Sequence, residues 1–361
     1  MMTSENPHKQ VSYGAEFMAV PIDAVPSGHR LDFDLYILRN GNHVLFARAG
    51  STFDAEKMRR MQCNDITTFY TCLGDGEAPQ LYARRADPAP HRYLESNLSR
   101  ILHDDRVDMG TKSKVFYSVA THLVKDVLED PRSGTTVKRA KEAVRSLVEL
   151  ILTQKGAFFN LLNITSHDYY TYTHSVNVCT LSIGLARRLG FKSQTEFLAL
   201  GVGALLHDVG KCTIDLSILN KPTKLSEDEW KVMQTHPLSG SRMVAPSPKM
   251  PSPPGEPRAE SATITMAFPS ISSDSVLVIE QHHEACNGKG YPHGLTYKEI
   301  HLYAKIVKIT DIYDALTTNR CYQKAFTPFQ AIKIMHEAHS QTSDQGIFRE
   351  FILLLGYGTR R

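Results

Sequence analysis

Seven side chains in the second half of the chain have the chemistry of ligands for divalent metal ions. They are His174, His207, Asp208, His236, His282, His283 and Asp311. Each lies on or beside an apolar stretch, where an imidazole or carboxylate loses its hydration unless a partner such as a metal ion replaces the water. A single residue of this kind is more often a helix cap or a satisfied core or surface residue. Together, on five helices, they favour a metal site inside a helical bundle.

The elements that must position these ligands are helices. Apolar residues recur at helical spacing from Val115 to Leu128 and again from Val137 to Ile151, and Pro131 to Gly134 separates the two runs. The same spacing predicts further helices over 174–188, 196–208, 226–236, 276–284, 299–317 and 327–338. From about residue 92 onward the chain is therefore predicted to be mostly α-helical.

The first ninety residues have a different pattern. Asn40-Gly41 stands between two alternating segments, which is a strong signal for a β-hairpin. Residues 66–70 predict another strand, and residues 53–62 a short helix. No residues here have catalytic spacing, so we interpret this part as a structural or regulatory module.

These patterns predict an α+β protein in which a small β-rich domain precedes an all-α domain that carries the polar residues. We expect the β-rich domain over 1–90, a helical connector over 91–135 and the helical domain over 136–361. Residues 245–275 contain seven prolines and many small residues, which predicts a flexible insertion rather than a binding motif for a partner.

Composition excludes several classes of protein. A net charge of +3 over 361 residues is too small to indicate a nucleic-acid polymer or a membrane surface as partner. No signal peptide begins the sequence, and no run of 18 apolar residues predicts a membrane span. The six cysteines form no C-x-x-C pair, which favours buried free thiols over a disulfide scaffold. We therefore expect a cytoplasmic protein.

Three motifs together resemble the HD-GYP family, an all-α branch of the HD metal-dependent phosphohydrolases. They are HDVGK at 207–211, HHEACNGKGYPHGL at 282–295 and ITDIYDALTTNRCY at 309–322. The resemblance extends from about residue 136 to the C-terminus, and the β-rich part resembles a short domain that precedes the catalytic domain in some members. Such proteins hydrolyse the bacterial second messenger cyclic di-GMP to the linear dinucleotide pGpG, and some continue to GMP.

The resemblance implies a binuclear metal site. It assigns His174, His207, Asp208 and Asp311 to one metal and His236, His282 and His283 to the other, with Asp208 bridging both. A set of nitrogen and oxygen ligands suits iron or manganese, and also accepts zinc or nickel. A hydroxide that bridges the two ions would be the nucleophile.

The resemblance also implies residues that contact the substrate. Asp208 and Lys211 would be catalytic, with the Lys211 ammonium directed at the phosphate. Tyr291 and Pro292 would shape the loop over the nucleotide. Arg320 would form a planar fork on a phosphate.

The sequence departs from the family pattern at four positions. Asn287 replaces an Asp, Gln323 replaces a basic residue, and Asp215 replaces a Pro. Tyr170, four residues before His174, replaces a Glu that binds a third metal in some members, so we expect two metals here.

The first two departures leave a second hypothesis open, in which a catalytically weakened domain binds the nucleotide or a signalling protein. A homodimer is also left open. Hydrolysis of an unrelated nucleotide is disfavoured by the GYP loop.

Overall fold

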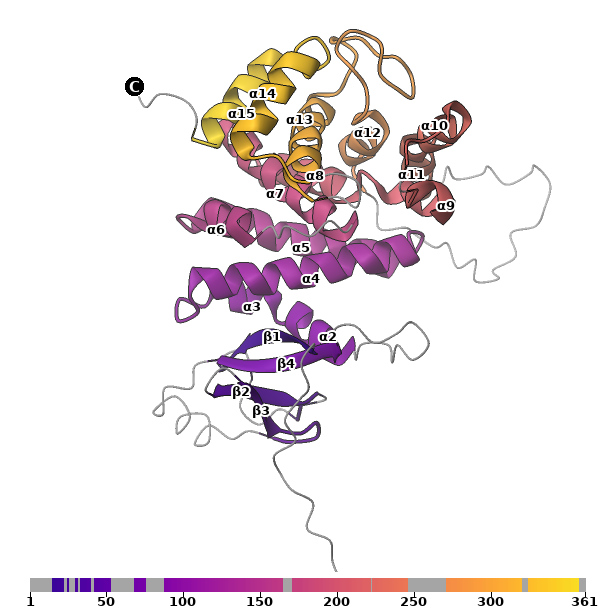
Figure 1. Ribbon diagram of the computed structural model, residues 1–361. Coiled ribbons are helices and arrows are strands. Elements are labelled where there is room, and N and C mark those ends of the chain that lie inside the picture. The colour runs from indigo at the N-terminus through magenta and orange to yellow at the C-terminus, as the bar shows by residue number, and fades with distance from the viewer. Residues whose placement is uncertain are drawn as a thin grey trace, which may run out of the picture. The chain divides into compact units, whose positions relative to one another are not determined.

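The computed structural model of this protein divides into two compact units, residues 1–119 and 120–361 (Figure 1). The structure describes residues 15–22, 25, 30–31, 33–39, 42–52, 68–75, 88–164, 171–221, 223–245, 271–319 and 324–356. The first unit contains a sheet and the second is helical in its described part, which confirms the predicted α+β class. Within those ranges no helix has the length and apolar character needed to cross a membrane.

The first unit contains a four-stranded antiparallel sheet with strand order β1-β4-β2-β3. Its strands are β1 (Ala15–Pro21), β2 (Leu35–Arg39), β3 (Asn42–Ala47) and β4 (Thr68–Asp75). Arg39 pairs with Asn42, so β2 and β3 form the predicted hairpin, although the turn at 40–41 lies outside the described residues. The predicted helix at 53–62 also lies outside them. The alternating side chains Phe33, Leu35 and Ile37 are all buried, as one shared face requires.

Three helices follow the sheet in the chain: α2 (Pro88–Ser96), α3 (Leu98–His103) and α4 (Met109–Glu129). Helix α4 is continuous across residues 119 and 120, where the two units divide. The predicted boundary at residue 136 falls inside the first turn of the next helix, α5 (Gly134–Thr153).

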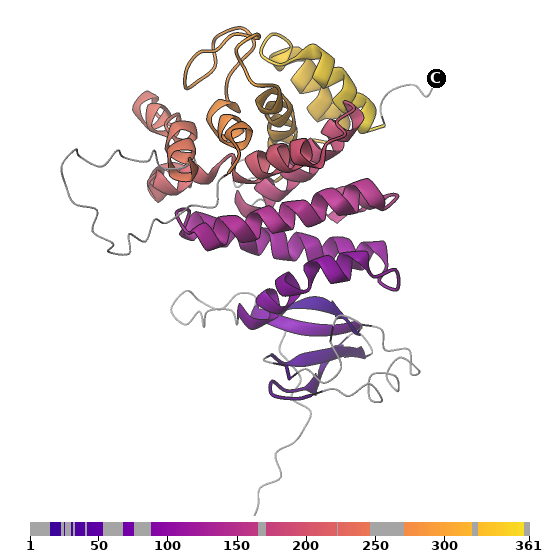
Figure 2. The same cartoon turned by 180° about the vertical axis from the view of Figure 1, so that it is seen from behind.

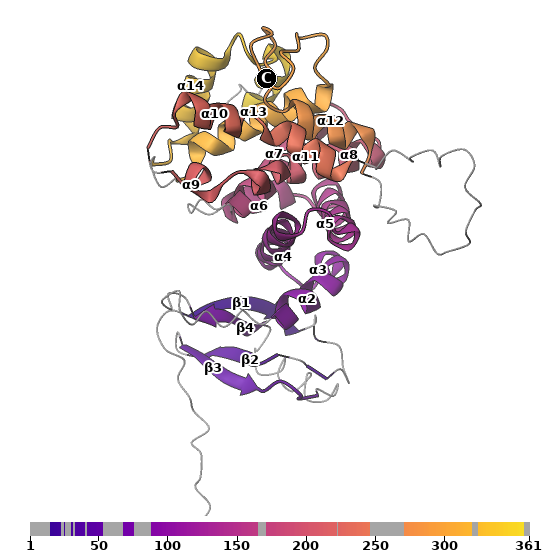
Figure 3. The same ribbon diagram turned by 90° about the vertical axis from the view of Figure 1, so that its right-hand side faces the viewer.

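After α5, the second unit continues with eleven further elements along its described residues. They are α6 (Ala157–Ile164), α7 (Thr171–Arg188), α8 (Gln194–Leu206), the 3-10 helix η2 (Val209–Thr213), α9 (Leu216–Leu219), α10 (Glu227–Met233), α11 (His236–Val244), α12 (Ser273–Gln281), α13 (Leu302–Thr317), α14 (Pro328–His339) and α15 (Gln345–Leu354). Helix α8 packs against α5, α7 and α12. Figure 3 shows α7, α8, α11 and α12 gathered in the middle of this unit.

Close packing of α8 brings the ligand-bearing helices together. A side chain at Gly203 would come within 2.6 Å of Val278 Cβ, so the missing side chain lets α12 approach α8. Every residue from Leu200 to Leu206 is buried. The apolar run that precedes His207 is therefore the centre of the helical core.

Three details differ from the sequence prediction. The helix predicted over 226–236 is two helices, since Pro237 lies in the first turn of α11, where its missing N–H costs no hydrogen bond. Helix α12 starts at Ser273, capped by the Ser272 side chain, so the predicted insertion extends too far at its C-terminal end. Residues 246–270 of the predicted insertion lie outside the described ranges. Helix α15 was not predicted; it buries Phe351 and, with α14, packs against α13 (Figure 2).

The described cysteines are free thiols. Cys179 is buried, and burial raises the pKa of its thiol. Cys72 and Cys286 are half-buried, and Cys212 is exposed. The prediction of buried thiols is therefore confirmed for Cys179 and wrong for Cys212.

Candidate metal centre

Helix ends supply most of the candidate ligands. His207 and Asp208 lie between α8 and η2, His236 is the first residue of α11, and His282 and His283 follow the last residue of α12. The other two ligands, His174 and Asp311, lie inside α7 and α13.

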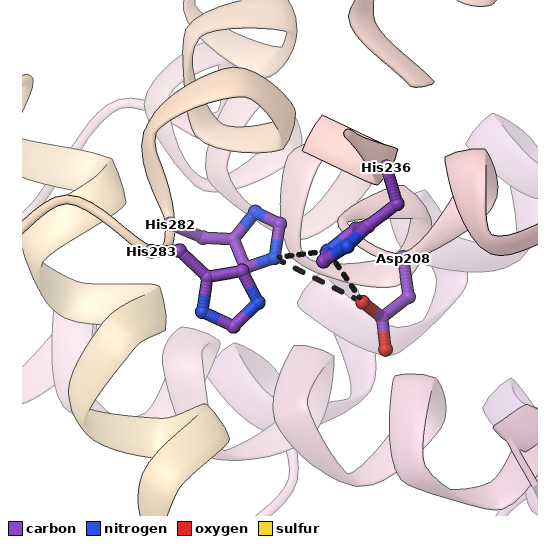
Figure 4. Close-up of side chains that lie close together, drawn as sticks. All are labelled: Asp208, His236, His282 and His283. Carbon is purple, nitrogen blue, oxygen red and sulfur yellow. Dashed lines mark hydrogen bonds and ion pairs between the residues drawn. The ribbon is translucent and has the colours of Figure 1, made fainter. Parts of the chain in front are cut away.

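The Asp208 carboxylate is the centre of the cluster. Its Oδ1 lies 3.4 Å from His236 Nε2 and 3.8 Å from His282 Nε2 (Figure 4). Its Oδ2 lies 3.3 Å from His207 Nε2 and 3.8 Å from His174 Nε2. One carboxylate thus presents each of its oxygens to a different set of imidazoles.

Two groups of possible ligand atoms share this carboxylate. In the first, Asp208, His236, His282 and His283 offer atoms that all lie within 4.8 Å of one another. In the second, His174, His207 and Asp208 do the same. Asp311 adjoins the second group through a distance of 3.2 Å from Oδ1 to His174 Nε2. All seven residues that the sequence suggested as ligands therefore converge.

The imidazoles are oriented by hydrogen bonds on the nitrogen that faces away from the cluster. Nδ1 of His207 lies 2.7 Å from the Ala204 carbonyl, and Nδ1 of His236 lies 2.8 Å from the Met233 carbonyl. His282 is bonded in the same way to a carbonyl of α12, at 2.9 Å. A carbonyl only accepts, so these Nδ1 atoms carry the proton and each Nε2 keeps a lone pair for a metal.

Two residues that the sequence analysis did not identify orient His174. Asp314 Oδ2 lies 2.7 Å from His174 Nδ1, and its Oδ1 accepts a hydrogen bond of 2.8 Å from Asn177. Asp314 stands three residues after Asp311, and Asn177 three after His174, which places each pair on one helix face. That spacing was a readable signal for both.

The cluster passes a test of fit for metal ions. His207 Nε2 and Asp208 Oδ1 are buried polar atoms without a hydrogen-bond partner, and such atoms are rare in proteins. Both face the cluster, where a divalent cation would accept their lone pairs. Burial lowers the pKa of His236 to about 4 and that of His283 to about 3, so both are neutral at pH 7, the form that binds metals.

Lys211 contributes the nearest positive charge. Its Nζ lies 2.6 Å from Asp208 Oδ2, and the residue belongs to the 3-10 helix η2. Burial acts to raise the pKa of Asp208, but Lys211 and His207 outweigh it and hold this pKa well below its ordinary value of 3.8. The direction of Lys211 toward a substrate phosphate stays a prediction.

The loop that carries Tyr291 and Pro292 lies against the first ligand group, at His283. The Tyr291–Pro292 peptide is cis, and the Tyr291 ring stacks on His283 with 4.7 Å between centroids and 24° between planes. A side chain at Gly290 would collide with the backbone of Glu284 and Ala285.

Glu284, which the sequence analysis did not identify, is 0% exposed. It accepts the backbone N–H groups of His293 at 2.7 Å and Leu295 at 2.9 Å. A buried carboxylate directly after the histidine doublet thus fixes the loop to the ligands.

Two of the departures from the family pattern have local structural roles. Asn287 is exposed, and its Oδ1 accepts the backbone N–H of Lys289 at 3.1 Å, so it closes a turn on the surface. Asp215 caps α9 through the backbone N–H of Ser217. Arg320, Gln323 and Tyr170 lie outside the described residues.

Comparison with known proteins identifies a matching family and several relatives. The HD domain family matches residues 158–347. The cyclic di-GMP phosphodiesterase PA4108 of Pseudomonas aeruginosa is 34% identical over 66% of this chain and 53% of its own length. The cyclic di-GMP phosphodiesterase response regulator RpfG of Xanthomonas campestris is 33% identical over 44% of this chain and 37% of its own. The 3'3'-cGAMP-specific phosphodiesterase 3 of Vibrio cholerae is 30% identical over 60% of this chain and 44% of its own length.

A solved structure shares the fold. Bd1817, an HDG"Y"P protein from Bdellovibrio bacteriovorus, aligns with 94% of this chain and 100% of its own at a TM-score of 0.60 and 21% identity. A buried centre of histidines and aspartates within a helical unit defines the class of protein to which this chain belongs. The chain belongs to the HD domain family, in its HD-GYP branch. It spans about half of the length of PA4108 and less of the other two relatives.

Proposed function

We propose that this protein is a metal-dependent phosphodiesterase that hydrolyses cyclic di-GMP to linear pGpG, with GMP as a further product. The observation that carries this proposal is the buried Asp208 carboxylate, whose two oxygens face two separate sets of imidazoles. A shared carboxylate is what two adjacent ions require, and paired ions suit phosphodiester hydrolysis. The names of PA4108 and RpfG support cyclic di-GMP as the substrate.

The ligand groups would hold two divalent ions. His174, His207 and Asp311 would bind one, the three histidines of the other group would bind the second, and Asp208 would bind both. We propose iron or manganese, since nitrogen and oxygen donors suit them, while zinc or nickel would also fit. When bound, the ions would supply a bridging hydroxide as the nucleophile and stabilise negative charge on the phosphoryl oxygens.

The protein's own residues would prepare this centre for the reaction. Backbone carbonyls and Asp314 keep the lone pairs of the imidazoles directed inward. Tyr291 covers one face of His283 and so limits the access of water. The Lys211 ammonium, 2.6 Å from Asp208 Oδ2, would offset the charge of this carboxylate and contact the substrate phosphate.

Metal content and product formation test the proposal on one sample. The protein is purified under anaerobic conditions, its metals are counted per chain, and cyclic di-GMP and 3'3'-cGAMP are each followed by chromatography. We expect about two metals per chain and pGpG from cyclic di-GMP, with no product after chelation. Faster turnover of 3'3'-cGAMP would overturn the substrate assignment.

Binding of cyclic di-GMP without hydrolysis, at full metal content, would instead favour the weakened signalling module. The surface position of Asn287 argues against that alternative, because its side chain closes a turn rather than facing the ligands. Size-exclusion chromatography of the same sample tests for the homodimer.

A further inference from the structure

A short series of aromatic rings leads away from the metal centre. Tyr291 stacks on the ligand His283, and the Trp230 indole lies 6.1 Å from the Tyr291 ring at an interplanar angle of 80°. Trp230 belongs to α10 and is 47% exposed. A large aromatic side chain is thus left partly open to solvent two ring contacts from the candidate ligands.

Local interactions hold α10, and therefore Trp230, in place. The helix begins with a capping box in which Ser226 and Glu229 each bond the other's backbone N–H. Both oxygens of Glu229 also accept from the Lys221 ammonium, at 2.7 and 2.6 Å. The indole therefore stands on an anchored helix rather than on an unrestrained loop.

The geometry leaves the indole able to accept another flat ring. When two rings lie nearly perpendicular, the edge of one meets the face of the other, so Tyr291 covers at most one face of the Trp230 indole. In a dinucleotide, one ribose separates each base from its phosphate. A phosphate at the metal centre would therefore keep its base near that centre, and the exposed indole lies two ring contacts from it.

We propose that Trp230 stacks on a guanine base of the substrate while the phosphate of that nucleotide lies at the metal centre. This assignment rests on the proposed function and adds a base-binding residue to it. Bases stack readily on aromatic side chains because every base has a π-face. Trp230 would therefore position the substrate without taking part in the proton or phosphoryl transfer.

Fluorescence offers a direct test, because Trp230 is the single tryptophan of the 361-residue chain. The metal-loaded protein is titrated with GMP and, separately, with ribose 5-phosphate, which lacks the base. We expect saturable quenching by GMP and none by ribose 5-phosphate. Equal changes with both ligands, or none with GMP while it competes for the site, would overturn the stacking.

Steady-state kinetics tests the same contact during turnover. For Trp230→Ala we expect KM for cyclic di-GMP to rise about 5- to 150-fold with little change in kcat, since stacking binds substrate and transition state alike. Trp230→Phe should recover most of the loss. The matched control is Val232→Ala, which removes a 42% exposed apolar side chain from the same helix.

The outcomes separate this assignment from the proposed function. Normal hydrolysis of cyclic di-GMP with an unchanged KM in Trp230→Ala would overturn the stacking alone. An equal rise of KM in Trp230→Ala and Val232→Ala would also overturn the stacking, because equal effects would indicate damage to α10 or a protein-binding surface. A metal-loaded wild-type protein that does not hydrolyse any cyclic dinucleotide would overturn the proposed function itself.

Discussion

Replacing Asp314 by Asn should weaken metal binding without touching any metal ligand. Asp314 is 4% exposed, and its carboxylate accepts from both His174 Nδ1 and Asn177 Nδ2, at 2.7 and 2.8 Å. An amide has a single acceptor oxygen, and its NH2 group would face a donor. One of the two neighbours must therefore lose its acceptor, or His174 must move its proton to the nitrogen that faces the metal.

The size of the effect follows from these contacts. A buried donor left without an acceptor costs about 1–3 kcal/mol. Loss of a carboxylate that orients a ligand histidine typically lowers metal affinity by about 10- to 100-fold. For Asp314→Asn we therefore expect one metal per chain to bind about 10- to 100-fold more weakly. The group of His236, His282 and His283 should keep its affinity.

Competition with a chromophoric chelator measures both affinities in one titration. The control variant is Asp126→Asn, which alters a carboxylate that lies 3.8 Å from His122 and 2.9 Å from Arg139, on α4 rather than at the ligand cluster. Its metal binding should match the wild type. A folded Asp314→Asn protein that holds both metals with wild-type affinity would refute the orienting role of Asp314.

The other predictions concern Asp208, His236 and Lys211. Asp208→Ala should abolish hydrolysis, measured by chromatography, and weaken the binding of both metals, measured by elemental analysis. Substantial activity with metal still bound would contradict the proposal that Asp208 binds both ions. The pKa of His236 is lowered to about 4 from 6.5, so between these pH values the unfolded chain binds more protons than the folded one.

The titration of His236 should therefore contribute a loss of up to about 3 kcal/mol to the stability of the metal-free protein as the pH falls from 6.5 to 4, and His236→Gln should remove this contribution from the pH dependence of urea unfolding. In the metal-free protein obtained with a chelator, Lys211→Met should lower the free energy of unfolding by about 3–5 kcal/mol. The reason is that the buried Asp208 carboxylate loses its cationic partner. The same substitution should destabilise the metal-loaded protein less. Equal losses of stability in both forms would contradict the role of Lys211 in neutralising Asp208.

The sequence predicted the helices well where a buried face imposes helical spacing. The apolar run before His207 became α8, because its residues fill the space between three other helices. Prediction was less accurate at helix ends. Pro237 starts a new helix where apolar spacing alone suggested a continuous one, and Ser272 caps α12 inside a segment whose composition suggested a loop.

The candidate ligands were predictable as a group because each combines a ligand-type side chain with an apolar neighbourhood. The residues that orient them were not, although their spacing was visible. Asn177 and Asp314 meet across 137 residues of sequence, and only the packing of α7 against α13 brings them together. Glu284 bonds backbone groups of the GYP loop, and such contacts leave no pattern in side-chain types.

The position of a histidine along its helix explains which ligands need a side-chain partner. The last carbonyls of a helix have no backbone N–H within the helix to accept from. They can therefore accept a hydrogen bond from an imidazole that follows the helix. His207, His236 and His282 use such carbonyls near the ends of α8, α10 and α12. The backbone of a preceding helix therefore orients each of them.

His174 lies inside α7, in its first turn, rather than at the residue that follows a helix. Its Nδ1 bonds Asp314 of another helix instead. This contrast explains why the three histidines at the ends of helices stood out in the sequence, since the end of an apolar run marks both the ligand and its acceptor. His174 has no such mark and depends on tertiary packing for its orientation. The same reasoning predicts that, among the candidate metal ligands, a change at Asp314 acts on His174 alone.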